Sequence, residues 1–187
     1  MQAYLDLRLL PDPEFPATVL MNALFAKLHR ALVTEAGGRL GVSFPATGST
    51  PPTLGNRLRL HGEAAALTGL MALDWLSGMH DHVALSALAE VPGHARFRVV
   101  RRVQAQSSPQ RLRRRLSRRH GYDAAAARRH IPDSAAERLD LPYVILNSRS
   151  TGQQFRLFIE HGPLLDKPVP GTFSSYGLSA QATVPWF

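Results

Sequence analysis

The stretch that most constrains this chain runs from Arg96 to His120, where ten arginines occur within 25 residues. No acidic residue lies between Glu90 and Asp123, so no carboxylate close in the sequence offsets this charge. Ten fixed positive charges repel one another, and a small domain that keeps them together is expected to bind an anionic partner. Arginine favours phosphate or base edges, because a guanidinium matches them with two hydrogen bonds. A solvated helix face and a basic tail are the alternatives.

The chain has 187 residues and a net charge of +8, and the positive charge is concentrated in its second half. Residues 1–95 carry six Lys and Arg against eight Asp and Glu, whereas residues 96–187 carry sixteen against six. A hydrophobic content of 44% is enough for a core. We therefore expect a nearly neutral domain over residues 1–94 and a domain that binds a polyanion over residues 95–187.

The residue types exclude several kinds of site. The chain has no cysteine, which excludes disulfides, thiol nucleophiles and cysteine-ligated metals. Its histidines form no HExxH motif, and His80-Asp81-His82 has no third ligand nearby in the sequence, so we expect no metal site and no cofactor. The first residues do not resemble a signal peptide, and no segment reaches the roughly 18 apolar residues of a membrane span. We expect a soluble, cytoplasmic protein that does not bind membranes.

Hydrophobic periodicity predicts a ferredoxin-like (βαββαβ) domain in the first half of the chain. Leu5, Leu7 and Leu9 alternate with polar residues, as in a strand with one buried face. Leu20, Leu24 and Leu28 recur instead at helical spacing. In order, we expect a strand over 4–10, a helix over 17–34, strands over 39–44 and 54–61, a helix over 63–80 that can break near 73–74, and a strand over 83–91. This order does not by itself give a function.

The second half predicts a smaller α+β domain with an arginine-rich helix. Ser108-Pro109 supplies the N-cap and the first-turn proline of that helix, on which Leu112 and Leu116 share the buried side and the arginines lie on another. A further helix is expected over 123–130, and extended segments are expected over 97–106, 143–146, 155–159, 173–177 and 183–187. The turn after 146 is rich in small hydroxyl residues.

His29 is a candidate for acid–base chemistry on RNA. Cleavage of RNA without a metal needs a base for the 2′-OH, an acid for the departing 5′-oxygen, and donors that hold the phosphate. Histidine suits the first two tasks because it titrates near neutral pH. His29 lies at the edge of the apolar arc of its helix, where a histidine is often only a boundary residue. Ser148 is likewise often a turn former and Tyr176 part of a core edge, so the residue types alone leave both interpretations open.

Six stretches, in order along the whole chain, resemble the CRISPR repeat-processing endoribonuclease of type I-F systems. They are YLDLRLLPDPEFP, MNALFAKLHRAL, LGVSFP, RRVQAQSSPQRLRRRLSRRH, SRSTGQQFRLFIEHGP, and YGLS with the terminal VPWF. The resemblance implies a metal-independent endoribonuclease that binds the stem-loop of CRISPR repeat RNA and cleaves at the 3′ base of the hairpin. Attack by the 2′-OH would leave 2′,3′-cyclic phosphate and 5′-hydroxyl ends and give mature guide RNA.

The resemblance also implies roles for particular residues. The catalytic residues would be His29 as base or acid, Ser148 holding the 2′-OH before the cut, and Tyr176 orienting the histidine. Asn147, Arg149 and Glu160 depart from the family's pattern near this site. The RNA-binding residues would be Arg102 and Gln104 on base edges, Phe155 on the terminal base pair, Ser150 and Thr151 near the scissile phosphate, and Arg111, Arg114, Arg115, Arg118, Arg119 and His120 in the major groove of the stem.

The partners that the resemblance implies are precursor and mature guide RNA and the other subunits of the type I-F interference complex. Two alternatives stay open. The first is a non-catalytic subunit that holds the same RNA hairpin, and the second is a general binder of nucleic acid or anionic membranes. The affinity of a general binder would depend on the salt concentration rather than on the sequence of the RNA hairpin. Each lost base-edge contact would instead cost a specific binder about 1–3 kcal/mol.

Overall fold

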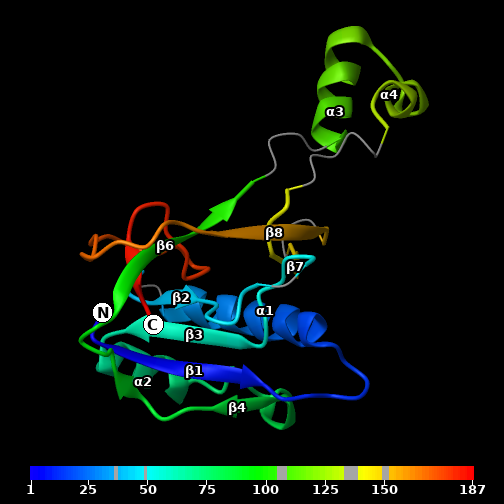
Figure 1. Ribbon diagram of the computed structural model, residues 1–187. Helices are drawn as coiled ribbons and strands as arrows, with labels where there is room; N and C mark the ends of the chain where they lie inside the picture. The colour runs from blue at the N-terminus through cyan, green and yellow to red at the C-terminus, as the bar shows by residue number, and fades with distance from the viewer. Residues whose placement is uncertain (36–37, 49, 105–108, 133–138, 149–151) are drawn as a thin grey trace. The chain divides into compact units, whose positions relative to one another are not determined.

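The computed structural model describes residues 1–35, 38–48, 50–104, 109–132, 139–148 and 152–187. Two compact units are present: residues 1–103 with 141–187 form the larger one, and residues 104–140 the smaller one. In the described residues, the larger unit holds two antiparallel sheets and the helices α1 and α2, and the smaller unit holds α3 and α4 (Figure 1). The predicted α+β class is confirmed.

The first sheet contains the strands predicted in the first half of the chain. They are β1 (Ala3–Leu9), β2 (Gly41–Ser43), β3 (Arg57–Gly62) and β4 (Val83–Leu85), in the order β2-β3-β1-β4, and β5 (Ala89–Glu90) also pairs with β1. All these pairs are antiparallel. The single strand predicted over 83–91 is divided, because residues 86–88 leave the ladder. The ferredoxin-like assignment stays a prediction, with which this order agrees.

Helices α1 (Ala17–Glu35) and α2 (Ala64–Ala72) pack on the first sheet and bury their leucines there. Along α1 the apolar residues at helical spacing are inside the protein, and Leu24 and Leu28 are at most 1% exposed. Helix α2 ends at Ala72, where the sequence predicted a break, and the 3-10 turn η1 (His80–His82) precedes β4.

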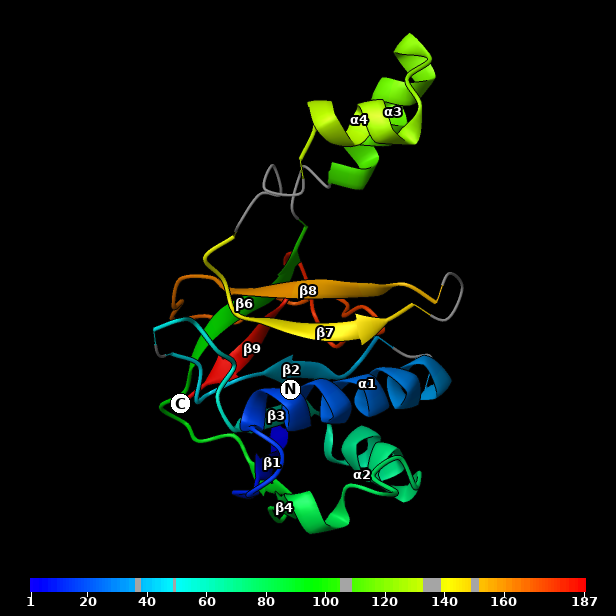
Figure 2. The ribbon, with the colours of Figure 1, turned by 90° about the vertical axis from the view of Figure 1, so that its right-hand side faces the viewer.

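The second sheet shares the hydrophobic core of the first. Its strands are β6 (Arg96–Val103), β7 (Tyr143–Asn147), β8 (Gln154–His161) and β9 (Thr183–Trp186), in the order β7-β8-β6-β9. Val144 and Leu157 belong to the same buried cluster as the leucines of α1, which lies between β7 and the first sheet (Figure 2). Because both sheets bury their faces in one core, the larger unit includes residues 95–103 and 141–187 as well as the first 94 residues, and the division predicted at residue 94 stays a prediction.

The smaller unit consists of α3 (Pro109–His120) and α4 (Ala124–His130). Asp123 caps α4, since its carboxylate accepts a hydrogen bond of 2.6 Å from the Ala126 N–H. Arg113 donates from Nε to the Ile131 carbonyl oxygen at 2.8 Å, which joins α3 to the end of α4. The side chains of Leu112 and Leu116, predicted on the buried side of α3, are half-buried.

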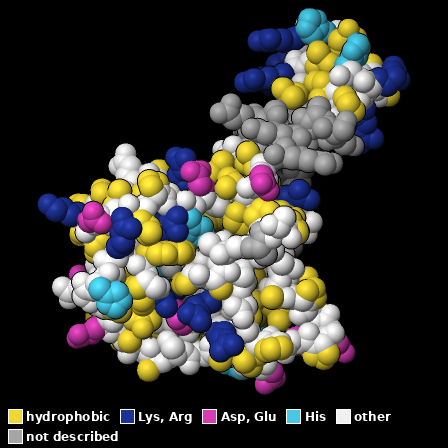
Figure 3. Space-filling view, viewed as in Figure 1, with side chains coloured by type: hydrophobic (Ala, Val, Ile, Leu, Met, Phe, Trp, Pro, Cys, Tyr) yellow, Lys and Arg dark blue, Asp and Glu magenta, His cyan; other side chains and the backbone are white. Residues whose placement is uncertain are grey.

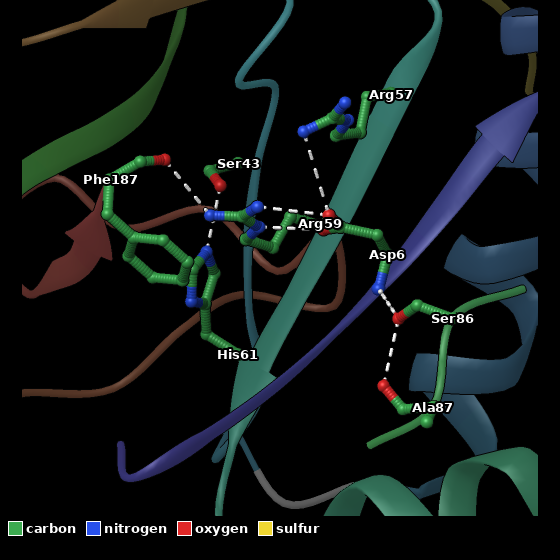
Figure 4. A network of polar contacts seen from close by, with 8 residues as sticks. All are labelled: Asp6, Ser43, Arg57, Arg59, His61, Ser86, Ala87 and Phe187. Atoms are coloured by element: carbon green, nitrogen blue, oxygen red, sulfur yellow. Dashed lines mark hydrogen bonds and ion pairs between the residues drawn. The ribbon is translucent and has the colours of Figure 1, made fainter. Parts of the chain in front are cut away.

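A buried ion pair lies on the face of the first sheet that α1 and α2 leave open (Figure 4). Arg59 is 4% exposed and holds the Asp6 carboxylate with hydrogen bonds of 2.6 and 2.9 Å. It also donates to the Phe187 carbonyl oxygen at 3.1 Å, and its guanidinium lies 4.0 Å from the centre of the Phe187 ring. These partners offset the cost of burying the charge. Arg57 meets the same carboxylate at 3.8 Å with 40% of its side chain exposed.

Replacing Arg59 by Met should lower the free energy of unfolding by about 3 kcal/mol, because the Asp6 carboxylate would keep its desolvation without its buried partner. Replacing Arg57 by Met should cost about 1 kcal/mol or less, since that pair is longer and more exposed. Urea unfolding at pH 7 measures both. Equal losses in the two variants would contradict this assignment.

One buried and one half-buried histidine lie in the larger unit, His61 on β3 and His161 at the end of β8. His61 is fully buried, with Nε2 2.8 Å from the Ser43 hydroxyl oxygen. His161 packs edge-on against the rings of Phe44 and Trp186. Burial lowers the pKa of His61 to about 3 and the pKa of His161 to about 4, and a nearby arginine acts in the same direction on each.

The protein should therefore begin to lose stability at pH values well above those at which carboxylates take up protons. An unfolded histidine takes up its proton near pH 6.5, whereas folded His161 does so near pH 4, so the unfolded state binds more protons between these values. Stability present above pH 6.5 is lost as the pH falls, by about 1–2 kcal/mol per histidine at pH 5. His161→Phe keeps a ring at this position. Between pH 7.5 and pH 5, its free energy of unfolding in urea should fall less than that of the wild-type protein. The same fall in both proteins would refute this account.

Candidate active site

Helix α1 places His29 at the border between the core and the solvent. Leu28, one residue earlier, is 1% exposed and fixes the rotation of the helix, so that the His29 ring is half-buried. The ring Nδ1 lies 2.9 Å from the backbone carbonyl oxygen of Ser175. A carbonyl only accepts, so Nδ1 is the protonated nitrogen. In neutral His29 the lone pair is therefore on Nε2, where it can take up a proton.

Tyr176 covers the imidazole of His29. The two rings stack with their centres 4.1 Å apart and an angle of 11° between their planes, and Phe25 lies parallel to Tyr176 at 6.4 Å. Tyr176 belongs to a turn in which the Gly177 N–H donates to the Ser174 carbonyl at 2.8 Å. The strand predicted over 173–177 is therefore wrong, because Gly177 has a φ of +69° and closes this turn.

A pocket of about 900 Å³ opens beside His29 in the larger unit. Residues of α1, Arg102 of β6, the end of β7 with Ser148, Phe155 of β8, and Tyr176 line it. The structure thus brings all three predicted catalytic residues to one pocket, together with two of the predicted RNA-binding residues. Among the described residues that line it are the cations Arg30 and Arg102, and none is acidic. Such a pocket favours an anionic ligand.

Ser148 stands directly after β7, at the start of the predicted hairpin turn. Its N–H donates to the Gln153 carbonyl and its carbonyl accepts from the Gly152 N–H, both at 2.8 Å, so its backbone is fixed. Strands β7 and β8 pair as the hairpin that the sequence predicted. The predicted phosphate-binding residues Ser150 and Thr151 lie outside the described residues.

Arg102 lies against the aromatic wall of the pocket. The central carbon of its guanidinium is 5.8 Å from the ring centres of both Phe155 and Tyr176. Such contacts orient the planar group while leaving its N–H donors at the edges for hydrogen bonds. The sequence predicted Arg102 only as a reader of base edges, and its place beside Tyr176 also lets it meet a phosphate in this pocket.

The other predicted RNA-binding residues belong to the smaller unit. Gln104 is exposed at the start of this unit. Arg111 lies on α3, but its side chain is not among those described. Arginine and histidine side chains project from this unit on the face seen in Figure 3. The side chains of Arg114, Arg115, Arg118, Arg119 and His120 are all exposed.

Several arginines of the 96–120 stretch have partners inside the protein, which the sequence did not indicate. Arg96 pairs with Asp166 at 3.2 Å, and Arg98 donates to the Gly162 carbonyl at 2.6 Å and covers the ring of Trp186. Arg101 holds Glu160 with hydrogen bonds of 2.9 and 3.0 Å. The stretch is therefore divided: part of it stabilises the second sheet and only part faces outward.

Two further findings concern metal binding and membrane-spanning helices. In the part of the chain that the structure describes, no three His, Asp or Glu side chains lie close enough to hold a metal ion together. No described helix is both long and apolar enough to cross a membrane.

Sequence patterns missed several residues of the pocket, among them Asn22, Arg30 and Thr34 of α1. Asn22 shares the face of α1 that carries His29 and precedes it by seven residues, or two helical turns. Helical periodicity around a candidate catalytic residue is therefore the signal that could have found Asn22.

NMR of the imidazole nitrogens should find neutral His29 in the Nδ1–H form, because the Ser175 carbonyl can only accept. The exposed His94 serves as the reference in the same spectrum. Observing the Nε2–H form of His29 would refute the hydrogen bond and the availability of Nε2 as a base.

Comparison with known proteins shows the family of the chain. The family model described as "CRISPR-associated protein (Cas_Csy4)" matches residues 4–187. A protein of Pseudomonas aeruginosa (strain UCBPP-PA14) named "CRISPR-associated endonuclease Cas6/Csy4" is 54% identical over 187 residues, the full length of both chains. An Escherichia coli protein (strain UTI89 / UPEC) of the same name is 49% identical over 187 residues, again the full length of both. The family predicted from the sequence is confirmed: the chain belongs to the Csy4 family of CRISPR-associated proteins.

Proposed function

We propose that this protein is a metal-independent endoribonuclease that binds the stem-loop of CRISPR repeat RNA and cleaves at the 3′ base of the hairpin. The observation that carries the proposal is the geometry of His29, whose Nδ1 bonds the Ser175 carbonyl at 2.9 Å while its ring stacks on Tyr176. A histidine held in this way keeps Nε2 for proton transfer beside a cationic pocket. The names of the relatives, which describe CRISPR-associated endonucleases, support the same reaction class.

In the proposed reaction His29 Nε2 removes the proton from the 2′-OH of the nucleotide before the cut. The 2′-oxygen forms a bond to the adjacent phosphorus as the bond from phosphorus to the 5′-oxygen breaks. The leaving 5′-oxygen takes up a proton from an acid, a task that protonated His29 can also perform. The products are a 2′,3′-cyclic phosphate and a 5′-hydroxyl, so the atoms and charges balance without a cofactor.

The neighbours of His29 give the remaining functions. The Ser148 hydroxyl, on a backbone fixed by its turn, would hold the 2′-OH. Tyr176 would keep the imidazole in its plane, and Arg102 would place donors where negative charge develops on the phosphate oxygens. Each of these groups lines the same pocket as His29.

Recognition of the hairpin would use side chains of the smaller unit together with Arg102 and Phe155 of the pocket. The exposed arginines of α3 would contact the stem, Arg102 and Gln104 would read base edges, and Phe155 would stack on the last base pair. Ser150 and Thr151 would bind near the cut. The protein would then keep the mature guide RNA and join the other subunits of a cytoplasmic interference complex.

His29→Ala should slow cleavage of repeat RNA by about 10²–10⁴-fold, the usual contribution of a general acid or base, and leave the hairpin affinity nearly unchanged. The assay is incubation in EDTA, analysis of the product ends, and a binding titration. His94→Ala, a matched change at an exposed histidine outside the pocket, is the control.

Full activity of the His29→Ala variant, or a requirement of the wild-type protein for added Mg²⁺, would contradict the proposed mechanism. Repeat RNA left intact by excess wild-type protein would point instead to a non-catalytic subunit that only binds the hairpin.

A further inference from the structure

Strand β7 is the edge of the second sheet, so that among the described residues no strand pairs with its outer side. The N–H of Ser148 donates to Gln153, and the N–H of Ile159 donates to Pro142, which shows that even-numbered residues from 142 to 148 bond toward β8. Residues of an antiparallel pair alternate in direction, so the N–H of Ile145 points away from β8. A half-buried N–H at such an edge needs a partner from elsewhere.

Asn22 of α1 supplies that partner. Its side-chain oxygen Oδ1 accepts from the Ile145 N–H at 2.9 Å across 123 positions of sequence. Both residues are half-buried, so water competes only in part for this bond. The bond is directional, because an amide oxygen accepts along its lone pairs, whereas the apolar contacts of α1 with β7 tolerate sliding.

The bond joins the two elements that carry the proposed chemistry. Asn22 lies seven residues, two helical turns, before His29 on the same face of α1. Ile145 lies three residues before Ser148 on β7. Asn22, His29, Ile145 and Ser148 all line the one pocket. Helix and strand are rigid over such short spans, so the Asn22 bond fixes the register between the base and the hydroxyl that would hold the 2′-OH.

We propose that Asn22 is a positioning residue that sets the placement of His29 relative to the nucleotide bound at Ser148. This inference rests on the proposed ribonuclease function. Misplacing reacting groups by about 1 Å can cost about 10²-fold in rate. Because Asn22 acts through the placement of α1 on β7, its loss lowers the rate of the bound complex and leaves the affinity for the hairpin nearly unchanged.

Three substitutions in the full-length protein separate this role from simple stability. Asn22→Leu has a similar size but no acceptor, Asn22→Asp keeps the acceptor oxygen, and Asn56→Leu makes the same change at an exposed position outside the pocket. Single-turnover cleavage of repeat RNA at saturating protein gives the rate. A hairpin with a 2′-deoxy nucleotide at the cut gives the affinity, and hydrogen exchange of the Ile145 amide reports the bond itself.

Asn22→Leu should lower the saturated cleavage rate by about 10–100-fold, with the affinity changed about threefold or less. Its Ile145 amide should exchange faster than in wild type. Asn22→Asp should restore most of the rate and of the amide protection, and Asn56→Leu should match wild type. Asn22→Ser, with a shorter acceptor, replaces Asn22→Leu if the latter does not fold.

A wild-type rate in folded Asn22→Leu, or a rate in Asn22→Asp as low as in Asn22→Leu while the Ile145 amide stays protected, would overturn the inference. A loss of affinity with an unchanged saturated rate would also overturn it, since Asn22 would then bind RNA directly. If wild-type protein binds but does not cleave, the proposed function fails and the catalytic role with it. The exchange of the Ile145 amide would still show whether Asn22 joins the two elements.

Discussion

The larger unit depends on one hydrophobic core that two sheets share. Leucines of α1, Leu58 and Leu60 of β3, and Leu157 of β8 belong to a single buried cluster, so the apolar faces of both sheets contribute to one core. Helix α1 is the layer between β7 and the first sheet. The buried face of α1 is therefore bordered by half-buried positions, and His29 and Asn22 occupy two of them. The candidate active site is the place where the core reaches the solvent between α1 and β7.

The position of the ring proton of His29 depends on contacts that connect the turn at Ser175 to this core. Ser175 accepts from His29 within a turn that the Gly177 carbonyl anchors to the Val42 N–H at 2.9 Å. Val42 is fully buried on β2. A Cβ on Gly177 would come 2.6 Å from a Val42 methyl, and the φ of +69° there also disfavours other residues. The first sheet thus fixes the turn, the turn fixes the tautomer, and Tyr176 fixes the ring plane.

The sequence predicted those features whose cause is local. Alternating and helical spacings located β1 and α1, Ser108-Pro109 located the start of α3, and the family motifs pointed to His29, Ser148 and Tyr176, which the structure brings to one pocket. Features with distant causes were missed. The turn at Tyr176 depends on Val42, the bond from Ile145 to Asn22 spans 123 positions, and the shared core joins residues 1–103 and 141–187 in one compact unit. Periodicity contains no information about such contacts, because it describes one element at a time.

The repulsion within the 96–120 stretch is reduced in two different ways. On β6, carboxylates or carbonyl oxygens of the same unit accept hydrogen bonds from, or form ion pairs with, Arg96, Arg98 and Arg101, so that part of their charge is offset within the unit. On α3, the exposed arginines instead rely on water and salt, which screen charges beyond about 8 Å at physiological ionic strength. Only this second group gains much from a polyanion, because its guanidinium groups can exchange water and counterions for phosphate oxygens. Under the proposed function, the attraction of the stretch for RNA would therefore belong mainly to α3, with Arg102 as the residue of β6 that lines the pocket beside His29.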